Sequence, residues 1–267
     1  FINIHLFTIF SYNYKYKFII LRINMRSIFL LLAFMVCSFA SSLNVAAASN
    51  TAYVLKEIKA EFIKLYPEAN INISLGSSGK LVAQIKNGAP FDIFLSADTD
   101  YANLLYKDGF APNKSKIYTS GNIAILSLRG FKPSLNSLKN KDIKTIVIAN
   151  PKTAPYGKAT LEVLKNIGIY DEIKHKIIEA NSIGDALNQT IKAGDIGFVA
   201  ASALKAEQMQ KYDNYAIIDS SLHANIDQAM LILNHGQNNK LAKAFYDFIL
   251  SHKAQEIFIK FGYRAIK

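Results

Sequence analysis

The chain has 267 residues, of which 51% are apolar, and it carries a formal net charge of +11 at pH 7. This length and apolar content suffice for one large domain or two small domains with buried cores. A basic protein favours anionic partners in a general way, but the lysines are scattered and form no run with interleaved aromatic residues, which argues against a nucleic-acid-binding surface.

The first 40 residues are expected to be absent from the mature protein. Residues 1–24 are rich in aromatic residues and Ile and contain no start methionine, which we interpret as an upstream extension. Residues 25–40 have the pattern of a secretory signal peptide: Arg26 is basic, residues 28–37 are apolar, and residues 38–40 form a small-x-small cleavage site. The sequence therefore predicts export to the periplasm. The alternative, an uncleaved membrane anchor, is disfavoured because the apolar run is short.

The only cysteine, Cys37, lies within the predicted signal peptide. Val36 before it is not the small residue that a lipoprotein signal requires, so no lipid anchor is expected there. Removal of residues 1–40 takes away four basic residues and no acidic residue, which leaves a net charge of +7. The mature chain would use neither disulfides nor thiol chemistry, which an exported protein with a large core can do without.

The mature chain begins with three units of the same kind, each a strand, a polar cap and a helix. In the first unit, Val54, Ile58 and Phe62 recur at helical spacing. Strands that alternate with helices indicate a parallel sheet covered on both faces, and ligands bind at the carboxyl ends of such strands. The expected strands are 43–48, 70–75 and 91–95, and the expected helices are 49–66, 80–87 and 98–106.

The pattern changes after the third unit. Strand-like residues 117–119 and 122–126 follow each other without a long helix between them, which indicates a crossing into a second domain. Residues 226–233 form a second crossing strand, and the remaining chain is helical up to Gly262. Two crossing strands predict a hinge between two lobes whose strand ends face a shared cleft. The lobes are expected at residues 41–121 with 229–267, and at residues 122–228.

The second lobe repeats the alternation of strands and helices. Ser182 and Asp185 form a capping box, a serine with an acid three residues on, and Ser202 is expected to cap another helix. Residues 150–157 read as a loop. The predicted fold class is therefore α/β with two lobes. The expected strands are 145–149, 177–180, 196–200 and 215–218, and the expected helices include 159–167 and 183–193.

Four strand-to-helix junctions, two in each lobe, carry small polar or glycine-rich caps. A helix N-terminus presents free N–H donors and a partial positive charge, which suit an anion. One such junction would be read as a structural cap, but four on converging strand ends predict an anion site in the cleft. Hydroxyl and N–H groups can hold a dianion there without a buried counter-charge, which would cost desolvation. The junctions are Ser49-Asn50, residues 77–79, residues 155–157 and residues 182–184.

No combination of residues predicts catalysis. Residues 76–79 (GSSG) are not the G-x-S-x-G of a nucleophile elbow. Lys80 after them lacks the spacing of a phosphate-binding P-loop and is expected to be a solvated residue of the first helical turn. The histidines outside the leader stand in no metal-binding spacing, and each is expected at the surface. They are His175, His223, His235 and His252.

Several stretches together resemble a known family. The most specific is residues 76–81 (GSSGKL), which continues into residues 84–98 (QIKNGAPFDIFLSAD). With the shorter stretches, the chain resembles the periplasmic molybdate-binding proteins of ABC importers (the ModA family) over essentially the whole mature chain. The shorter stretches are residues 46–50 (AAASN), 154–157 (APYG), 197–200 (GFVA) and 261–263 (FGY).

The resemblance implies a type II periplasmic binding protein with two lobes that close on a hinge. Such a protein binds molybdate, and tungstate with it, and delivers the anion to an ABC permease in the inner membrane. The resemblance further implies a monomer with no enzymatic activity and no cofactor, in which the ligand oxygens contact the protein and the metal does not. Some family members have a tyrosine after Gly-x-Val, where this chain has Ala200, and Tyr156 can supply the compensating donor. The family's ligand donors map onto Ser49, onto Asn50, onto the hydroxyl and N–H of Ser78, onto Tyr156, and onto the backbone N–H of Ile183.

Three alternatives remain at this point. The first is a sulfate- or phosphate-binding protein, which belongs to the same class of oxyanion-binding proteins. Phosphate carries a proton that needs an acceptor, and Asp185 would serve as that acceptor if it faced the ligand. Sulfate is smaller than molybdate. An enzyme built on the same fold would need a paired nucleophile and base, which the sequence does not supply. A ligand-sensing domain of a regulator is disfavoured by the export signal.

Overall fold

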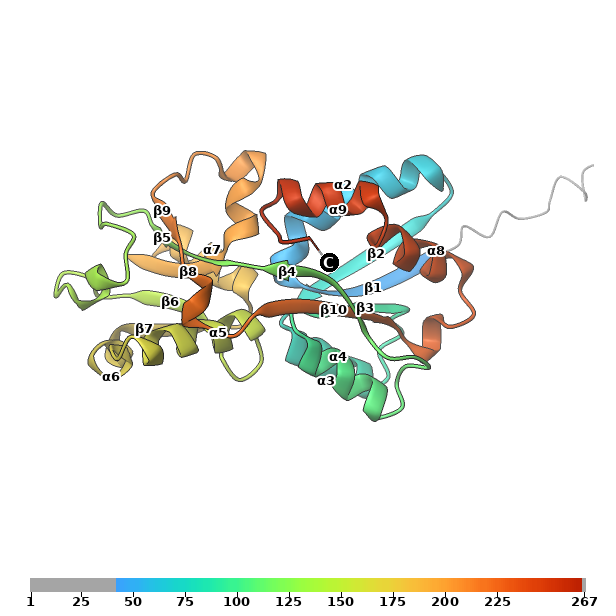
Figure 1. Cartoon of the computed structure of the whole chain (residues 1–267), viewed down its shortest axis with the longest axis horizontal. Helices are drawn as coiled ribbons and strands as arrows, with labels where there is room; N and C mark the ends of the chain where they lie inside the picture. The colour runs from blue at the N-terminus through green and yellow to red at the C-terminus, as the bar shows by residue number, and fades with distance from the viewer. Residues whose placement is uncertain (1–41, 266–267) are drawn as a thin grey trace, which may run out of the picture. The chain divides into compact units, whose positions relative to one another are not determined.

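The computed structural model describes residues 42–265 (Figure 1). The predicted upstream extension and signal peptide lie outside the described residues. Within residues 42–265, no helix is both long enough and apolar enough to cross a membrane. This part of the chain is built on two five-stranded mixed sheets with flanking helices, which confirms the predicted two-lobed α/β fold. We call the part around the first sheet lobe I and the part around the second sheet lobe II.

The sheet of lobe I has the strand order β2-β1-β3-β10-β4. β1 pairs in parallel with β2 and β3, whereas β10 runs antiparallel to β3 and β4. The carboxyl ends of β1, β2 and β3 therefore lie at the same end of the sheet. The strands are β1 (Ser42–Ala48), β2 (Asn70–Gly76), β3 (Ile93–Leu95), β4 (Lys116–Gly121) and β10 (Ile226–Ile232).

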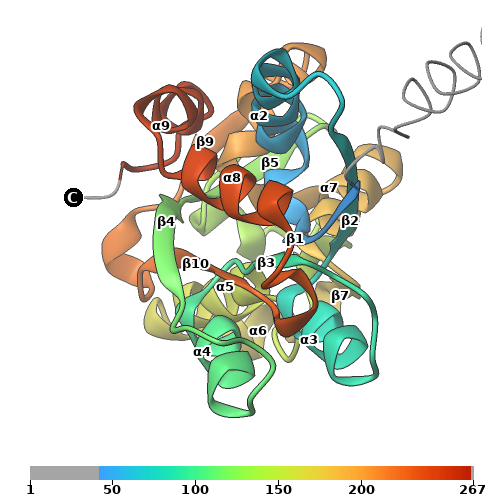
Figure 2. The same ribbon diagram turned by 90° about the vertical axis from the view of Figure 1, so that its right-hand side faces the viewer.

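Successive residues of β1 serve opposite faces of this sheet, as the pleat of a strand requires. Leu43, Val45 and Ala47 pack in one core with α2, α8 and α9, whereas Ala46 packs with α3 and α4 on the other face. Figure 2 shows these two helix layers on either side of the sheet. The helices are η1 (Ser49–Thr51), α2 (Ala52–Leu65), α3 (Ser78–Lys86), α4 (Thr99–Lys107), η7 (Asn234–Gly236), α8 (Lys240–Ile249) and α9 (His252–Lys260).

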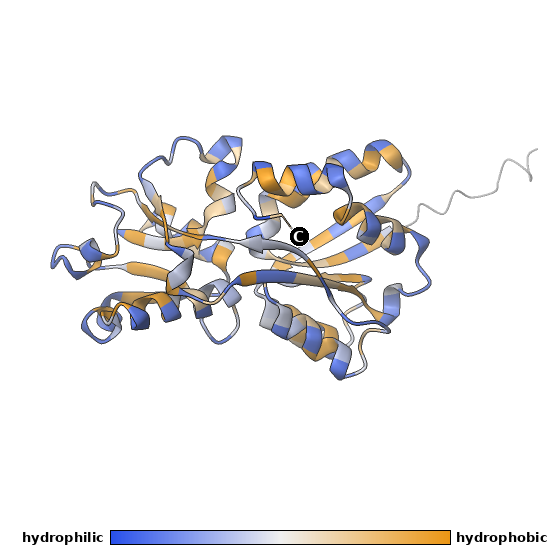
Figure 3. Cartoon of the chain, in the orientation of Figure 1, coloured by the Kyte–Doolittle hydropathy of each residue, from blue (hydrophilic) through white to orange (hydrophobic). Residues whose placement is uncertain are grey.

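The sheet of lobe II has the order β7-β6-β8-β5-β9, in which β6 is parallel to β7 and β8, and β5 is antiparallel to β8 and β9. Apart from β2 and β4, the strands of both lobes are mostly hydrophobic (Figure 3). The strands are β5 (Ile123–Ser127), β6 (Ile146–Ala149), β7 (Ile177–Ala180), β8 (Ile196–Ala200) and β9 (Tyr215–Ile217). The helices are η2 (Asn136–Lys139), α5 (Pro155–Asn166), α6 (Tyr170–Ile173), η3 (Lys174–Lys176), α7 (Ile183–Lys192), η4 (Ala201–Lys205), η5 (Glu207–Met209) and η6 (Ser220–Leu222).

The two crossings between the lobes lie side by side. Asn122 separates the end of β4 from the start of β5, and β10 begins with Ile226, which pairs with Gly121 at the end of β4. Figure 1 shows β4 and β10 running next to each other along this part of the molecule. We expected the chain to re-enter lobe I at residue 229, and β10 pairs with β4 already from Ile226.

Three local expectations are wrong. α5 begins at Pro155, not at residue 159, because proline suits the first helical turn, where an N–H has no intrahelical partner. Tyr156 therefore lies in a helix and not in a loop. α3 begins at Ser78, two residues earlier than expected. Ser202 caps no helix: it is buried in η4, and its hydroxyl donates to the carbonyl oxygen of Asn50 at 3.3 Å.

Candidate functional site

A small cavity lies where β1 and β2 of lobe I end and where α5 and α7 of lobe II begin. Every residue that the resemblance marks as a ligand donor lines this inner cavity, and none of its lining residues is charged. Its volume of about 10 Å³ is close to what one water molecule needs. The lining residues are Ala48, Ser49, Asn50, Gly76, Ser77, Ser78, Ala97, Ala154, Pro155, Tyr156 and Ile183.

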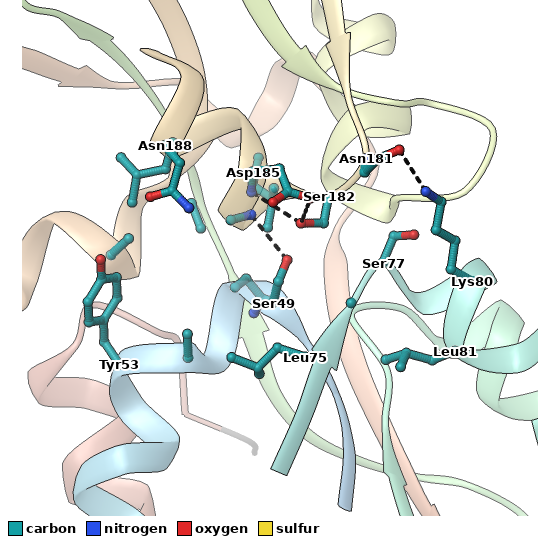
Figure 4. Close-up of a pocket in the computed structure, with 18 of the residues that line it drawn as sticks. Ser49, Tyr53, Leu75, Ser77, Lys80, Leu81, Asn181, Ser182, Asp185 and Asn188 are labelled. Atoms are coloured by element: carbon teal, nitrogen blue, oxygen red, sulfur yellow. Dashed lines mark hydrogen bonds between the residues drawn. The ribbon is translucent and has the colours of Figure 1, made fainter. Parts of the chain in front are cut away.

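Ser49 faces lobe II from the end of β1. It is the first residue of η1, which continues into α2. Its hydroxyl oxygen accepts a hydrogen bond of 3.1 Å from the backbone N–H of Gly184, the second residue of α7 (Figure 4). A Cβ at position 184 would lie 3.2 Å from the Cβ of Ser49, so glycine lets α7 approach this closely. The bond joins the two lobes directly across the site.

Asn50 has no side-chain hydrogen left for a ligand. It is 3% exposed, and its amide nitrogen donates to Gln228 Oε1 at 2.9 Å and to the Tyr263 hydroxyl at 3.0 Å. The amide has only these two hydrogens. Asn50 Oδ1 is buried and has no partner among the described residues. The donor that Asn50 can offer is its backbone N–H, because a group in the first turn of a helix has no intrahelical acceptor.

The two serines before α3 have different surroundings. Ser77 has the extended backbone of an N-cap residue but makes no cap bond, and its buried hydroxyl has no partner in residues 42–265. Ser78 is the first helical residue and is fully buried, and its hydroxyl oxygen accepts from the N–H of Ala97 at 3.0 Å. That bond leaves the hydroxyl hydrogen of Ser78 available. Ser77 therefore occupies the N-cap position of α3 without using its hydroxyl as a cap.

Tyr156 enters the cavity from the first turn of α5. Its ring is 1% exposed, and its hydroxyl oxygen accepts from Gln228 Nε2 at 3.2 Å. Burial, reinforced by the neighbouring Tyr263 and Tyr118 hydroxyls, raises the pKa of Tyr156 well above its usual range. The hydroxyl therefore keeps its hydrogen at every physiological pH. Because it accepts from Gln228, that hydrogen can be donated elsewhere.

Ile183 is the first residue of α7, and its side chain forms an apolar wall of the cavity. Ser182 caps the helix by accepting from the N–H of Asp185 at 3.1 Å, and its hydroxyl donates to the Asp185 carboxylate at 2.9 Å. The predicted capping box is thus confirmed, and the carboxylate is held by Ser182 (Figure 4). The N–H of Ile183 has no intrahelical acceptor at this position.

A larger outer cleft of about 400 Å³ opens beside the inner cavity. Lys80 reaches across it and donates to Asn181 Oδ1 of lobe II at 2.7 Å (Figure 4). Two further bonds join the lobes nearby: Gly79 N–H donates to Thr153 O at 2.9 Å, and the Tyr101 hydroxyl donates to Lys152 O at 3.0 Å. Ala200 lines the outer cleft and not the inner cavity. Lys80 is exposed, but it contacts the other lobe and is not purely solvated.

The described residues form no candidate metal site, and the histidines noted in the sequence lie outside the inner cavity. The described residues contain no group of three or more His, Cys, Asp or Glu side chains that could hold a metal ion. His235 Nδ1 lies 2.9 Å from the buried Asp92 carboxylate, and neither residue lines the inner cavity. The expectation of a surface position is wrong for His223, which is 8% exposed and lies 2.7 Å from the carbonyl oxygen of Ala224.

Comparison with known proteins identifies the family. A profile of the bacterial extracellular solute-binding proteins matches residues 43–264. The molybdate-binding protein ModA of Azotobacter vinelandii is 34% identical over 229 residues, which cover 84% of this chain and 90% of that protein. The chain belongs to the ModA family of bacterial extracellular solute-binding proteins.

Two further ModA-family comparisons agree. The molybdate-binding protein ModA of Rhodobacter capsulatus is 30% identical over 221 residues, which cover 82% of this chain and 86% of that protein. The solved structure of the Azotobacter vinelandii periplasmic molybdate-binding protein superimposes with a TM-score of 0.78 at 30% identity, covering 84% of this chain and all of that one. The fold and the family that the sequence motifs indicated are therefore confirmed.

In this ModA-family chain, two residues that shape the inner cavity were given no role of their own from the sequence: Gly184 was named only as part of the junction 182–184, and Gln228 only as part of the crossing strand 226–233. Gly184 brings α7 against Ser49, and its position directly after Ile183 at a helix N-terminus was the available signal. Gln228 holds both Asn50 and Tyr156 from the middle of β10. A polar residue that is fully buried within a hydrophobic strand was the signal for Gln228.

Proposed function

We propose that this protein binds molybdate, and tungstate with it, and delivers the anion to an ABC permease. The observation that carries the proposal is the inner cavity: Ser49, Ser78 and Tyr156 supply hydroxyls to it from both lobes, and no charged residue lines it. The molybdate-binding relatives from Azotobacter vinelandii and Rhodobacter capsulatus support the choice of anion.

Neutral donors are suited to a dianion in a buried site. Each charge-assisted hydrogen bond contributes roughly 1.5–3 kcal/mol. The N-termini of α3, α5 and α7 meet at the cavity, and their partial positive charges favour an anion without the desolvation cost of a buried lysine or arginine. The proposed contacts are the hydroxyls of Ser49, Ser78 and Tyr156 and the backbone N–H groups of Asn50, Ser78 and Ile183.

Binding exchanges one bond between the lobes for bonds to the anion. The Ser49 hydroxyl and the Gly184 N–H now meet at 3.1 Å across the site, and a tetrahedral oxyanion is larger than the cavity volume of about 10 Å³ allows. Ligand entry therefore separates Ser49 from Gly184 by a small hinge movement. The freed Ser49 hydroxyl then points at the anion from lobe I, and the Tyr156 hydroxyl and the Ile183 N–H point at it from lobe II, so each lobe supplies donors to the same ligand.

Charge and size separate molybdate from the commoner oxyanions. Hydrogen phosphate carries a proton that needs a buried acceptor, and Asp185 is already held by Ser182. One observation favours the phosphate alternative: Asn50 Oδ1 is a buried acceptor without a partner in the described part of the chain. Sulfate has the charge of molybdate but is smaller, and it would not reach the donors of both lobes together. Tungstate has nearly the size of molybdate, so these donors hold both.

The proposal extends to the protein's location, oligomeric state and mode of action. The protein is exported to the periplasm by the signal peptide at residues 25–40, acts as a monomer, and needs no cofactor. We propose no catalysis for it, because the residues that line the inner cavity pair no nucleophile with a base. Closure of the lobes around the anion presents a defined shape to the permease, which releases the ligand by drawing the lobes apart.

A thermal-shift panel tests the proposal. The purified protein is melted alone and with molybdate, tungstate, sulfate or phosphate at equal ionic strength. A ligand at one hundred times its dissociation constant stabilises the folded state by about 2.7 kcal/mol, so molybdate and tungstate at micromolar to millimolar concentration should raise the melting temperature by several degrees. A larger shift with phosphate or sulfate, or none with molybdate, would overturn the proposed ligand.

A further inference from the structure

A buried polar cluster joins the hinge to the inner cavity, and Gln228 is its centre. Gln228 lies in β10 and is fully buried. Its Oε1 accepts from Asn50 Nδ2 and from the Tyr118 hydroxyl, both at 2.9 Å, and its Nε2 donates to the Tyr156 hydroxyl at 3.2 Å. One side chain thus touches two residues of the inner cavity, one from each lobe, and a tyrosine of the other hinge strand.

The backbone around Gln228 is shaped for this contact. The pairing of β10 with β4 shifts register between Gln228 and Ala229, and an irregularity of this kind changes the direction in which a side chain points. Gly121, which pairs with Ile226, ends β4, and a Cβ at that position would clash with the Tyr156 hydroxyl and lie 2.8 Å from Gln228 Nε2. Glycine at 121 is therefore what allows Tyr156 and Gln228 to meet.

The direction of these hydrogen bonds decides what Tyr156 can do. Gln228 Oε1 is engaged by two donors, so its Nε2 is the atom that faces Tyr156. A hydroxyl has one hydrogen, and a Tyr156 oxygen that accepts from Gln228 keeps this hydrogen for a different acceptor. Tyr156 lines the inner cavity, where the anion is the acceptor in the proposed function.

We infer that Gln228 is a positioning residue that makes Tyr156 a hydrogen-bond donor to the bound oxyanion and links this donor to the hinge strand β10. The inference rests on the proposed function, because it needs an anion in the inner cavity. It does not depend on which oxyanion binds. Gln228 does not touch the ligand; it acts through Tyr156.

The groups around Gln228 do not titrate in the range where binding is measured. Its hydrogen-bonding neighbours are Asn50, Tyr118 and Tyr156, and Tyr263 contacts Asn50 on the far side. Burial raises the pKa of Tyr118 and of Tyr156 well above the usual range, and raises that of Tyr263 to about 12. Any dependence of binding on pH in a variant at position 228 therefore comes from the new side chain.

A double-mutant cycle separates positioning from packing. The oxyanion that gives the largest thermal shift is titrated by calorimetry into the wild type, Gln228→Met, Tyr156→Phe and the double variant. We expect Gln228→Met to weaken binding about threefold to tenfold, as for a neutral hydrogen bond, and to have an effect of less than about twofold when Tyr156 is already Phe. An equal loss in both backgrounds would overturn the inference, because Gln228 would then act independently of the Tyr156 hydroxyl.

Gln255→Met is the matched control. Gln255 donates to the carbonyl oxygens of Tyr118 and Ile249 and does not line the inner cavity. This variant should lower the melting temperature without changing anion affinity by more than about twofold. A loss of affinity as large as that of Gln228→Met would show that any disturbance of this region weakens binding, and would overturn a specific role for Gln228.

Gln228→Glu tests the direction of the bond and does not depend on the folding of the Met variant. A protonated Glu can donate to Tyr156 as Gln does, whereas an ionised Glu accepts from Tyr156 and removes its hydrogen from the anion. We expect Gln228→Glu to bind the anion with near wild-type affinity at low pH. Above the pKa of the new carboxyl, which burial raises, its affinity should fall about tenfold per pH unit. The affinity of the wild type should not change between pH 5.5 and 9. If Gln228→Glu instead follows the wild type over this whole range and Gln228→Met binds normally, the inference fails while the proposed function stands. If no oxyanion stabilises the wild type, the proposed function itself fails.

Discussion

Replacement of Ser78 by Ala should reduce both the stability of the ligand-free protein and its affinity for molybdate. The Ser78 hydroxyl has two roles in the structure. Its oxygen accepts from the buried N–H of Ala97 at 3.0 Å, and its hydrogen is free to point into the inner cavity, which the residue lines. The substitution removes both interactions and changes the volume of the side chain by only one oxygen atom.

The two losses have different sizes. An unpaired buried N–H costs about 1–3 kcal/mol, and for a domain of this length each kcal/mol lowers the melting temperature by about 2–4 °C. We therefore expect the ligand-free Ser78→Ala protein to melt about 2–12 °C below the wild type. Loss of one charge-assisted bond of about 1.5–3 kcal/mol should weaken molybdate binding about 10-fold to 150-fold. Differential scanning calorimetry measures the first effect, and isothermal titration calorimetry measures the second.

Ser77→Ala is the matched control for stability. The two serines are adjacent and both buried, but the Ser77 hydroxyl has no partner in the described residues. Removal of an unpaired buried hydroxyl is neutral or slightly stabilising, so the melting temperature of ligand-free Ser77→Ala should stay within about 2 °C of the wild type or rise. If Ser78→Ala matches Ser77→Ala in both melting temperature and affinity, the roles assigned to the Ser78 hydroxyl are refuted.

Three further predictions concern the lobe contacts and the buried tyrosines. In Gly79→Ala the new Cβ would lie 2.6 Å from the hydroxyl of Tyr101 in the same lobe and 3.1 Å from the carbonyl oxygen of Thr153 in lobe II. Because the crowded contact with Thr153 crosses between the lobes, we expect the lobes to stay apart, the affinity to fall about tenfold, and the radius of gyration measured by X-ray scattering to rise. Unchanged affinity and radius would disprove this. Lys80→Met should slow anion association about twofold to fivefold at low salt. Lys86→Met, which removes the same charge, should leave the association rate unchanged. Equal association rates for the two variants would exclude electrostatic steering by Lys80. Burial raises the pKa of Tyr263 from 10.0 to about 12, so its contribution to stability is complete below pH 10 and is lost as the pH rises toward 12. Urea unfolding between pH 9 and 12 should show that the free energy of unfolding falls less steeply with pH in Tyr263→Phe than in the wild type. Parallel curves for the two proteins would contradict the raised pKa of Tyr263.

Much of the fold could be predicted because the sequence of this chain carries strong local signals. Buried strands such as 145–149 and 196–200 are short apolar runs bounded by polar or glycine residues, and the structure places β6 and β8 there. The helix expected at 98–106 is α4, and Asp98 caps it by accepting from the N–H of Tyr101 at 3.0 Å. The rule that ligands bind at the carboxyl ends of parallel strands brought Ser49 and Ser78 together correctly.

The remainder depends on contacts between distant segments, which periodicity does not report. The first turn of α5 also needs Gly157 to pack on the end of β6, because a Cβ at that position would clash with Ala149 O. The sequence Pro-Tyr-Gly alone reads as a loop. Gln228 is bonded to Asn50, which is 178 residues away in the chain. No local pattern could show that this pair meets, nor that the amide hydrogens of Asn50 are used within the protein.

Anomalous diffraction can show directly whether the inner cavity holds the bound oxyanion. Crystals of the purified protein grown with molybdate would be measured at the molybdenum absorption edge, where anomalous scattering marks the metal alone. We expect one strong peak in the inner cavity, with ligand oxygens about 2.7–3.2 Å from the hydroxyls of Ser49, Ser78 and Tyr156 and from the backbone N–H of Ile183. A peak in the outer cleft or beside a surface lysine, with none in the inner cavity, would contradict this expectation.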